Sequence, residues 1–138
     1  MSSGALDHDA YREIIRVYFA AFGTGDFSDV RFSPDVEFLT PLSETTKKGR
    51  DEVIAFLEPV TTRVSAVDVI SIAVDVPTAS GVWQMTTTKG VTYTLHNFFR
   101  LDGDGLRYIW PMFDPKAVLK DPAGLVAWLS GVGYDDAG

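Results

Sequence analysis

This sequence contains few types of side chain that could act as a nucleophile, a general acid or base, or a metal ligand. It has 19 carboxylates but no cysteine, and its two histidines are His8 and His96. Without cysteine there can be no disulfide, thiolate metal site or cysteine nucleophile, and two histidines are too few for a histidine-rich zinc centre. The imidazole of His96, the histidine expected in ordered structure, could act as a general base near neutral pH. We expect no metal and no cofactor.

Length and charge limit the function classes. A chain of 138 residues predicts a single domain, 1–138, that can bury its own core. The net charge of −7 argues against nucleic acid and against an anionic membrane surface as partners. No uncharged run is long enough to span a bilayer, and the N-terminus has no targeting pattern. We therefore expect a cytoplasmic protein.

Two segments near the N-terminus have the apolar spacing of amphipathic helices. In the first, apolar side chains recur three and four positions apart. They are Tyr11, Ile14, Ile15, Tyr18, Phe19 and Phe22. Asp7 or Asp9 can cap its start, and Gly23 and Gly25 can end it. A second helix is expected at 49–60.

The strands follow from alternation and from turn residues. A short strand is expected at 36–40, followed by a polar loop at 43–48. The four later strands are expected in hairpin succession at Val64–Val76, Val82–Thr88, Val91–Leu101 and Leu106–Phe113. A tight turn at Lys89–Gly90 joins the second and third of these. Short helices should begin at Asp114 and Asp121, each followed by proline, and 131–138 should be a disordered tail. The order predicts an α+β fold with a curved antiparallel sheet wrapped around the N-terminal helices, enclosing a pocket.

Four segments, in this order and spacing, resemble the nuclear transport factor 2-like superfamily, which includes ketosteroid isomerases and SnoaL-type polyketide cyclases. They are YFAAFGTGDF (18–27), RFSPDVEFLTPLS (31–43), KGRDEVIAFLEPV (48–60) and HNFFRLDGDGLRYIWPMFDP (96–115). The resemblance implies a cone-shaped sheet closed by helices around an apolar pocket. It also implies dimers formed through the outer face of the sheet.

The resemblance carries over only part of the superfamily's chemistry. Tyr18 matches the tyrosine that donates a hydrogen bond in ketosteroid isomerases, although it also completes the apolar stripe of its helix and could be a core aromatic. The aspartate base corresponds to Thr40, and the second aspartate corresponds to Asn97, whose amide could still donate to an oxyanion. The cyclase aspartate corresponds to Pro111. The predicted catalytic residues are Tyr18, Asn97 and, if the strand turns it inward, His96.

Alternation along the hairpin sorts the remaining candidates. Asn97 and His96 are neighbours on a strand, so they point to opposite faces, and we predict Asn97 inside. With Asn97 inside, alternation also places Tyr93, Leu95, Phe99, Val82, Gln84 and Thr86 inside. The predicted substrate-binding residues combine four of these with candidates from other segments: Phe22, Phe38, Thr40, Phe56, Gln84, Thr86, Tyr93, Phe99 and Phe113. The outer face would then carry Trp83, Met85, His96 and Phe98, which is too much apolar surface to leave in water. This predicts a homodimer through this face, unless a helix of the same chain covers part of it.

Two functions remain open from the sequence. The first is a cofactor-independent SnoaL-like cyclase, isomerase or dehydratase acting on a mostly apolar, polyketide- or terpenoid-like molecule. The alternative is a non-catalytic small-molecule-binding or dimeric assembly domain of the same fold. The interior should discriminate between them, because a titratable group near a ligand carbonyl favours an enzyme, whereas a closed cone filled by aromatic rings favours a binding or assembly domain.

Overall fold

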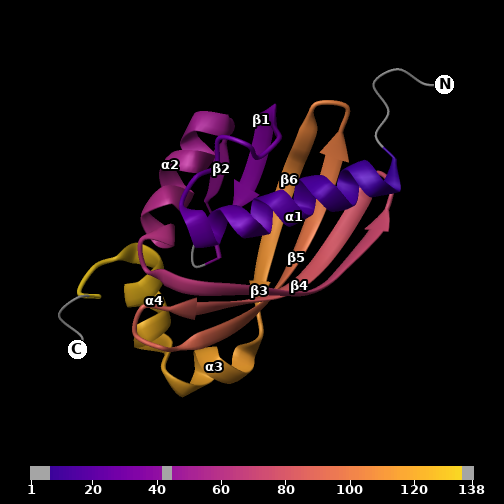
Figure 1. Cartoon of the computed structure of the whole chain (residues 1–138). Helices are drawn as coiled ribbons and strands as arrows, with labels where there is room; N and C mark the ends of the chain where they lie inside the picture. The colour runs from indigo at the N-terminus through magenta and orange to yellow at the C-terminus, as the bar shows by residue number, and fades with distance from the viewer. Residues whose placement is uncertain (1–6, 42–44, 135–138) are drawn as a thin grey trace.

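The computed structural model describes residues 7–41 and 45–134 (Figure 1). Its helices are α1 (His8–Thr24), α2 (Arg50–Thr61), α3 (Pro115–Lys120) and α4 (Pro122–Ser130). Its strands are β1 (Phe32–Leu39), β2 (Thr46–Lys48), β3 (Val64–Asp75), β4 (Thr78–Thr87), β5 (Thr92–Asp102) and β6 (Gly105–Phe113). No helix in this part of the chain is both long and apolar enough to cross a membrane.

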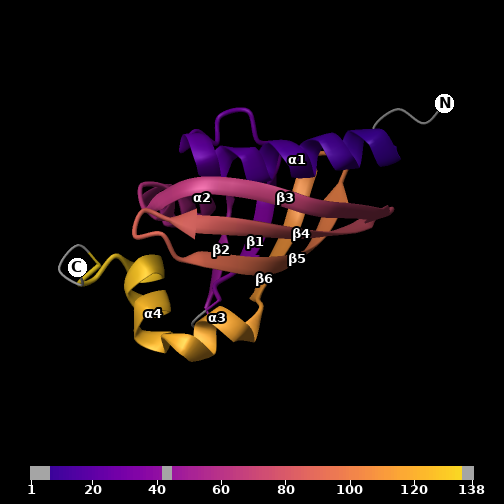
Figure 2. The same cartoon turned by 60° about the horizontal axis from the view of Figure 1, so that its bottom comes forward.

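The strands form one curved sheet in the order β2-β1-β6-β5-β4-β3. α1 lies across one face of this sheet, and α3 and α4 lie together at one end of it (Figure 2). The predicted α+β fold is confirmed. The expectation of a wholly antiparallel sheet is wrong at one place, because β1 pairs with β6 in parallel. The sheet is therefore mixed, and it stays open between its edge strands β2 and β3.

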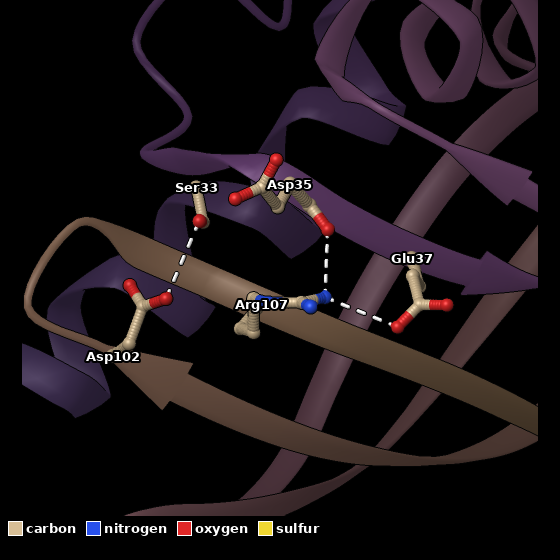
Figure 3. Close-up of polar contacts among 5 residues, drawn as sticks. All are labelled: Ser33, Asp35, Glu37, Asp102 and Arg107. Carbon is tan, nitrogen blue, oxygen red and sulfur yellow. Dashed lines mark hydrogen bonds and ion pairs between the residues drawn. The ribbon is translucent and has the colours of Figure 1, made fainter.

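The parallel pair contains an irregular stretch that side chains bridge (Figure 3). The register between β1 and β6 shifts ahead of Glu37, which leaves backbone groups of β1 without ladder partners. Arg107 of β6 donates to the carbonyl of Asp35 at 2.6 Å and to the carboxylate of Glu37 at 3.1 Å. Ser33 donates to Asp102 at 3.3 Å. These contacts tie β1 to β6 through Arg107 and to β5 through Asp102.

α1 forms where the sequence pattern predicts it. Asp7 accepts from the backbone N–H of Ala10 at 2.8 Å, and Gly25 ends the helix with a φ of 78°. The predicted apolar stripe is buried against the sheet. The loop expected at 43–48 is wrong in its last part, since Thr46–Lys48 form β2 and pair with β1. Residues 42–44 lie outside the described part.

The end of the chain packs more tightly than the sequence suggests. Tyr134 is buried, its hydroxyl hydrogen-bonds that of Thr88 at 2.9 Å, and the Lys89 ammonium lies 4.7 Å from its ring centroid. The prediction of a disordered tail is therefore wrong for 131–134, while 135–138 lie outside the described residues. A single buried aromatic ring explains the difference, because it anchors the segment after α4 to the β4–β5 loop.

Candidate functional site

The β4–β5 hairpin decides which side chains enter the cone. Asn97 is 1% exposed and His96 is exposed, so the predicted faces of these two residues are confirmed. Asn97 lies opposite Gly81, Leu95 opposite Trp83, and Tyr93 opposite Met85. Directly opposed residues share a face of a sheet. Trp83 and Met85 are therefore inside the cone, and the prediction that they form an outer dimer face is wrong.

The length of one loop causes this reversal. Thr86 pairs with Thr92, so the loop between β4 and β5 has three residues, Thr88–Gly90, and not the two expected. Only Gly90 has a positive φ, of 81°. One additional loop residue shifts the pairing by one position and turns every side chain of β4 to the other face. For the same reason Gln84 and Thr86 lie on the outer face, where they hydrogen-bond Thr94 and Thr92.

The interior of the cone is nearly filled. A cavity of about 30 Å³ remains between α1, α2, the end of β1 and the inner faces of β4, β5 and β6. Most of its lining is apolar: Phe22, Phe38, Pro41, Phe56, Leu57, Val60, Trp83, Met85, Leu95, Pro111, Phe113 and Leu129. The two remaining lining residues, Tyr18 and Asn97, are polar. This volume corresponds to roughly one water molecule.

Tyr18 and Asn97 bring polar groups without partners to this cavity. Tyr18 is 1% exposed, and no hydrogen bond to its hydroxyl is found among the described residues. Burial raises the pKa of the Tyr18 phenol far above its usual range, so it stays protonated at physiological pH. The amide oxygen of Asn97 accepts from Trp83 Nε1 at 2.8 Å, whereas its buried Nδ2 has no partner among the described residues. Both groups can donate to a guest atom.

The other predicted site residues divide between the cavity, the core and the groove. Phe22, Phe38, Phe56 and Phe113 line the cavity, as expected of substrate-binding residues. Phe99 packs behind it, with its ring centroid 5.6 Å from that of Tyr18.

Tyr93 and Thr40 lie outside the cavity lining. Tyr93 points inward but stacks on Trp128 at 5.0 Å. The hydroxyl of Thr40, at the position of the missing base, donates to the Thr45 carbonyl at 2.8 Å. His96 lies on the outer face and so cannot act as a base in this cavity.

A second, larger depression lies next to the cavity. It is an open groove between the β1–β6 edge, α3 and α4, and Glu37, Leu39, Trp110, Met112 and Val118 are among its lining residues. Pro41, Pro111 and Phe113 line both the groove and the cavity. These three residues therefore form the wall between the interior and solvent.

The comparisons with known proteins agree with this architecture. A family model described as a domain of unknown function, DUF4904, matches residues 6–134. The chain belongs to this family. No curated protein matches the sequence. Among solved structures, an uncharacterized protein with a cystatin-like fold from Silicibacter pomeroyi is 20% identical, with a TM-score of 0.71 over 90% of this chain and 87% of that one.

Two further structures share the fold of this DUF4904 member. A nuclear transport factor 2-like protein of unknown function from Mesorhizobium loti is 14% identical, with a TM-score of 0.69 over 80% of this chain and 97% of that one. A candidate ketosteroid isomerase from Kribbella flavida is 15% identical, with a TM-score of 0.65 over 75% of this chain and 77% of that one. The fold is thus nuclear transport factor 2-like. Identities at this level show the fold alone.

Proposed function

We propose that this chain binds a compact, mostly apolar small molecule that carries an oxygen acceptor, and that it does so without catalysing proton transfer. The observation that supports binding is the buried Nδ2 of Asn97, which has no partner among the described residues, in an otherwise apolar cavity that Tyr18 also lines. A buried polar group without a partner costs roughly 1–3 kcal/mol of stability. A guest oxygen between the two donors would recover that cost, while the aromatic lining would bury the rest of the guest.

The absence of a base favours binding over catalysis. The described residues that line the cavity include no aspartate, glutamate, histidine or lysine. A general base must come within hydrogen-bond reach of the proton that it removes. His96 is on the other face of β5, and the hydroxyl of Thr40 is engaged with Thr45. A mechanism like that of ketosteroid isomerases would therefore have no side chain in this cavity to accept the proton.

A cyclase- or isomerase-like activity is the second candidate, and one observation favours it. Tyr18 and Asn97 are two neutral donors at one cavity, which is the arrangement that stabilises a developing oxyanion in ketosteroid isomerases. The fold shared with the candidate ketosteroid isomerase from Kribbella flavida is consistent with this. Such an activity would have to act on a substrate that loses its proton to its own functional group or to water. A polyketide- or terpenoid-like molecule fits the apolar lining.

A guest must enter past the wall formed by Pro41, Pro111 and Phe113. The cavity of about 30 Å³ is smaller than any organic ring, so binding requires these side chains to move. Phe113 is the most suitable of the three, because it is partly exposed and ends β6 beside Asp114, the N-cap of α3. The groove outside this wall gives the guest a path from solvent.

Binding is tested with a small ring ketone and a variant that fills the cavity. Cyclohexanone at tenfold its dissociation constant should stabilise the wild type by about 1.4 kcal/mol, which thermal unfolding detects as a shift of a few degrees. Val60→Leu adds a methylene group to the cavity lining and should abolish the shift. Val53→Leu is the matched control, because Val53 is buried on the same helix but does not line the cavity. No shift in the wild type, or an equal shift in Val60→Leu, would contradict binding at this site.

The same ketone distinguishes a binder from an enzyme. If the cavity promotes enolisation, the protons next to the cyclohexanone carbonyl exchange with deuterium in D₂O, which proton NMR records. We expect no exchange above the buffer rate. Exchange that depends on Tyr18 and Asn97 would favour the isomerase-like function instead.

We also propose a second copy of this chain as the partner of the outer face. On that face Trp110 is 43% and Met112 37% exposed, and Phe98 lies opposite Trp110 across the β5–β6 pair. The homodimer expected from the sequence would therefore use Phe98, Trp110 and Met112 in place of Trp83 and Met85. Three neighbouring apolar side chains on an open strand face are typical of a homodimer interface.

A further inference from the structure

The hydrogen bond between Trp83 and Asn97 determines which end of this amide, at a residue that lines the cavity, is left without a partner. An indole N–H is only a donor, so the group that it contacts at 2.8 Å must be the amide oxygen. The nitrogen of Asn97 is then the end left without a partner beside the cavity. Nδ2 carries two N–H groups and accepts nothing. At this position the cavity presents a donor and no acceptor.

Trp83 is itself held in place by the rings of α1. Its ring stacks on Phe19 at 4.3 Å with an interplanar angle of 26°, and Phe22 meets it edge-on at 4.9 Å. Phe19 has room to stack because its neighbour on β4 is Gly81, where an added Cβ would lie 2.7 Å from Phe19 Cζ. Gly81 also lies opposite Asn97 in the β4–β5 pair. The indole therefore cannot turn away without disturbing two packed rings.

We infer that Trp83 is a positioning residue that holds Asn97 as a permanent donor, so the cavity selects neutral guests whose buried atom is a hydrogen-bond acceptor, such as a ketone or ester oxygen. This inference rests on the proposed function. Tyr18 does not impose the same choice, because a phenol hydroxyl can donate or accept. Asn97 requires an acceptor on the guest as long as its amide oxygen is hydrogen-bonded to Trp83. A hydrocarbon of the same shape leaves the buried N–H groups unpaired and is rejected.

The experiment compares two probes that differ at one position. Cyclohexanone and methylenecyclohexane have the same ring, with C=O in the first and C=CH₂ in the second. We expect the wild type to bind the ketone about tenfold more tightly than the alkene, as one hydrogen bond to a buried donor predicts. In ¹⁵N-labelled protein the side-chain NH₂ resonances of Asn97 should shift with the ketone and stay nearly unchanged with the alkene.

Two substitutions test the role of Trp83. Trp83→Phe removes the indole donor, frees the amide to rotate, and should reduce the preference to about threefold or less. Trp128→Phe is the matched control, since Trp128 is also buried and its Nε1 donates to the Arg63 carbonyl outside the cavity lining. This control should keep the tenfold preference. Should Trp83→Phe fail to fold, Asn97→Leu takes its place and should bind both probes equally.

The outcomes separate this inference from the proposed function. Equal affinities of the wild type for the two probes would overturn the inference and leave binding intact. So would a preference that Trp83→Phe retains in full, or one that Asn97→Leu retains in full. If neither probe binds at millimolar concentration, the proposed function fails, and the inference fails with it. A ketone preference that is lost in Trp83→Phe and kept in Trp128→Phe supports both.

Discussion

Both faces of the sheet formed by β4, β5 and β6 carry aromatic and polar side chains, but the two faces differ in how these side chains are buried and hydrogen-bonded. Inside, Trp83 and Phe99 are packed by α1, while the Tyr18 hydroxyl and the Asn97 Nδ2 lack partners among the described residues. Outside, Trp110 is exposed and Phe98 is only half-buried, yet the polar side chains nearby pair with each other, as Gln84 does with Thr94. The inner face therefore buries its apolar side chains but leaves a donor unpaired, whereas the outer face pairs its polar side chains but leaves apolar ones exposed.

This difference indicates what each face is built to accept. A surface that only had to be soluble would not need exposed tryptophan and methionine, and a core that only had to be stable would not need an unpaired amide. On the inner face the donor Asn97 Nδ2 has no acceptor among the described residues, and a small guest can bring one. The outer face lacks apolar cover, which a second protein surface can bring. The following experiments test this contrast in order of expected effect.

The largest effect should come from truncating the two neighbouring rings at the end of β5. Phe99 is 0% exposed and contacts Tyr18 and Phe19, so Phe99→Ala should cost about 3–5 kcal/mol of unfolding free energy. Phe98→Ala, one residue earlier on the outer face, should cost about 1 kcal/mol in the monomer. Urea denaturation measures both. Similar losses for the two variants would mean that the outer face is packed as tightly as the core.

Adding a methyl group at Gly81 should have the next largest effect. The new Cβ would lie 2.7 Å from Phe19 Cζ, and the stacked rings of Phe19 and Trp83 leave little room for relaxation. We expect Gly81→Ala to cost about 2–3 kcal/mol. Ser80→Ala, at an exposed neighbouring position, is the control and should be close to neutral. A stable Gly81→Ala would show that Phe19 can move, which would weaken the argument that Trp83 is fixed.

The dimer proposed for the outer face should depend on Trp110. Buried interface tryptophans contribute about 2 kcal/mol or more, so Trp110→Ala should raise the dimer dissociation constant about thirtyfold. Sedimentation equilibrium over a range of concentrations measures this constant. Leu119→Ala is the control, because Leu119 is 76% exposed but lies on α3. A wild type that stays monomeric at high micromolar concentration would refute the dimer.

Much of the fold follows from local patterns in the sequence, and the errors occur where pairing is not local. The apolar stripe locates α1, and the structure selects Asp7 and Gly25 from the two candidates that the sequence offers for each cap. By contrast, β2 is a run of threonine and lysines without alternation, and only its pairing with β1 makes it a strand. The parallel direction of β1 against β6 also has no local signal, because it joins segments about seventy residues apart.

The sequence correctly predicts which side chains of β5 point into the cone, but the prediction for β4 is wrong because of the length of one loop. Alternation placed Asn97 inside, as the structure has it, but a two-residue loop at Lys89–Gly90 put Trp83 outside. The residue types in this loop argue against a two-residue turn. A two-residue hairpin loop of the favoured type needs positive φ at both positions, which lysine rarely adopts. A three-residue loop with Gly90 last fits better, and it brings Trp83 inside beside Asn97.

The smallest effect concerns the Tyr18 phenol at high pH. Because burial raises its pKa in the folded state, only the unfolded chain loses this proton as the pH passes about 10. The unfolded state then binds fewer protons, so stability must fall as the pH rises, by roughly 1.4 kcal/mol at pH 11 for this one group. Tyr18→Phe should not show this loss of stability. The variant should still lose some stability between pH 9 and pH 11, because burial also raises the pKa of Tyr11 and of Tyr93. Urea unfolding at pH 9 and pH 11 measures the difference. An equal decline in both proteins would mean that Tyr18 ionises while folded, which requires water at its hydroxyl and therefore a wetter interior than the contrast between the two faces implies.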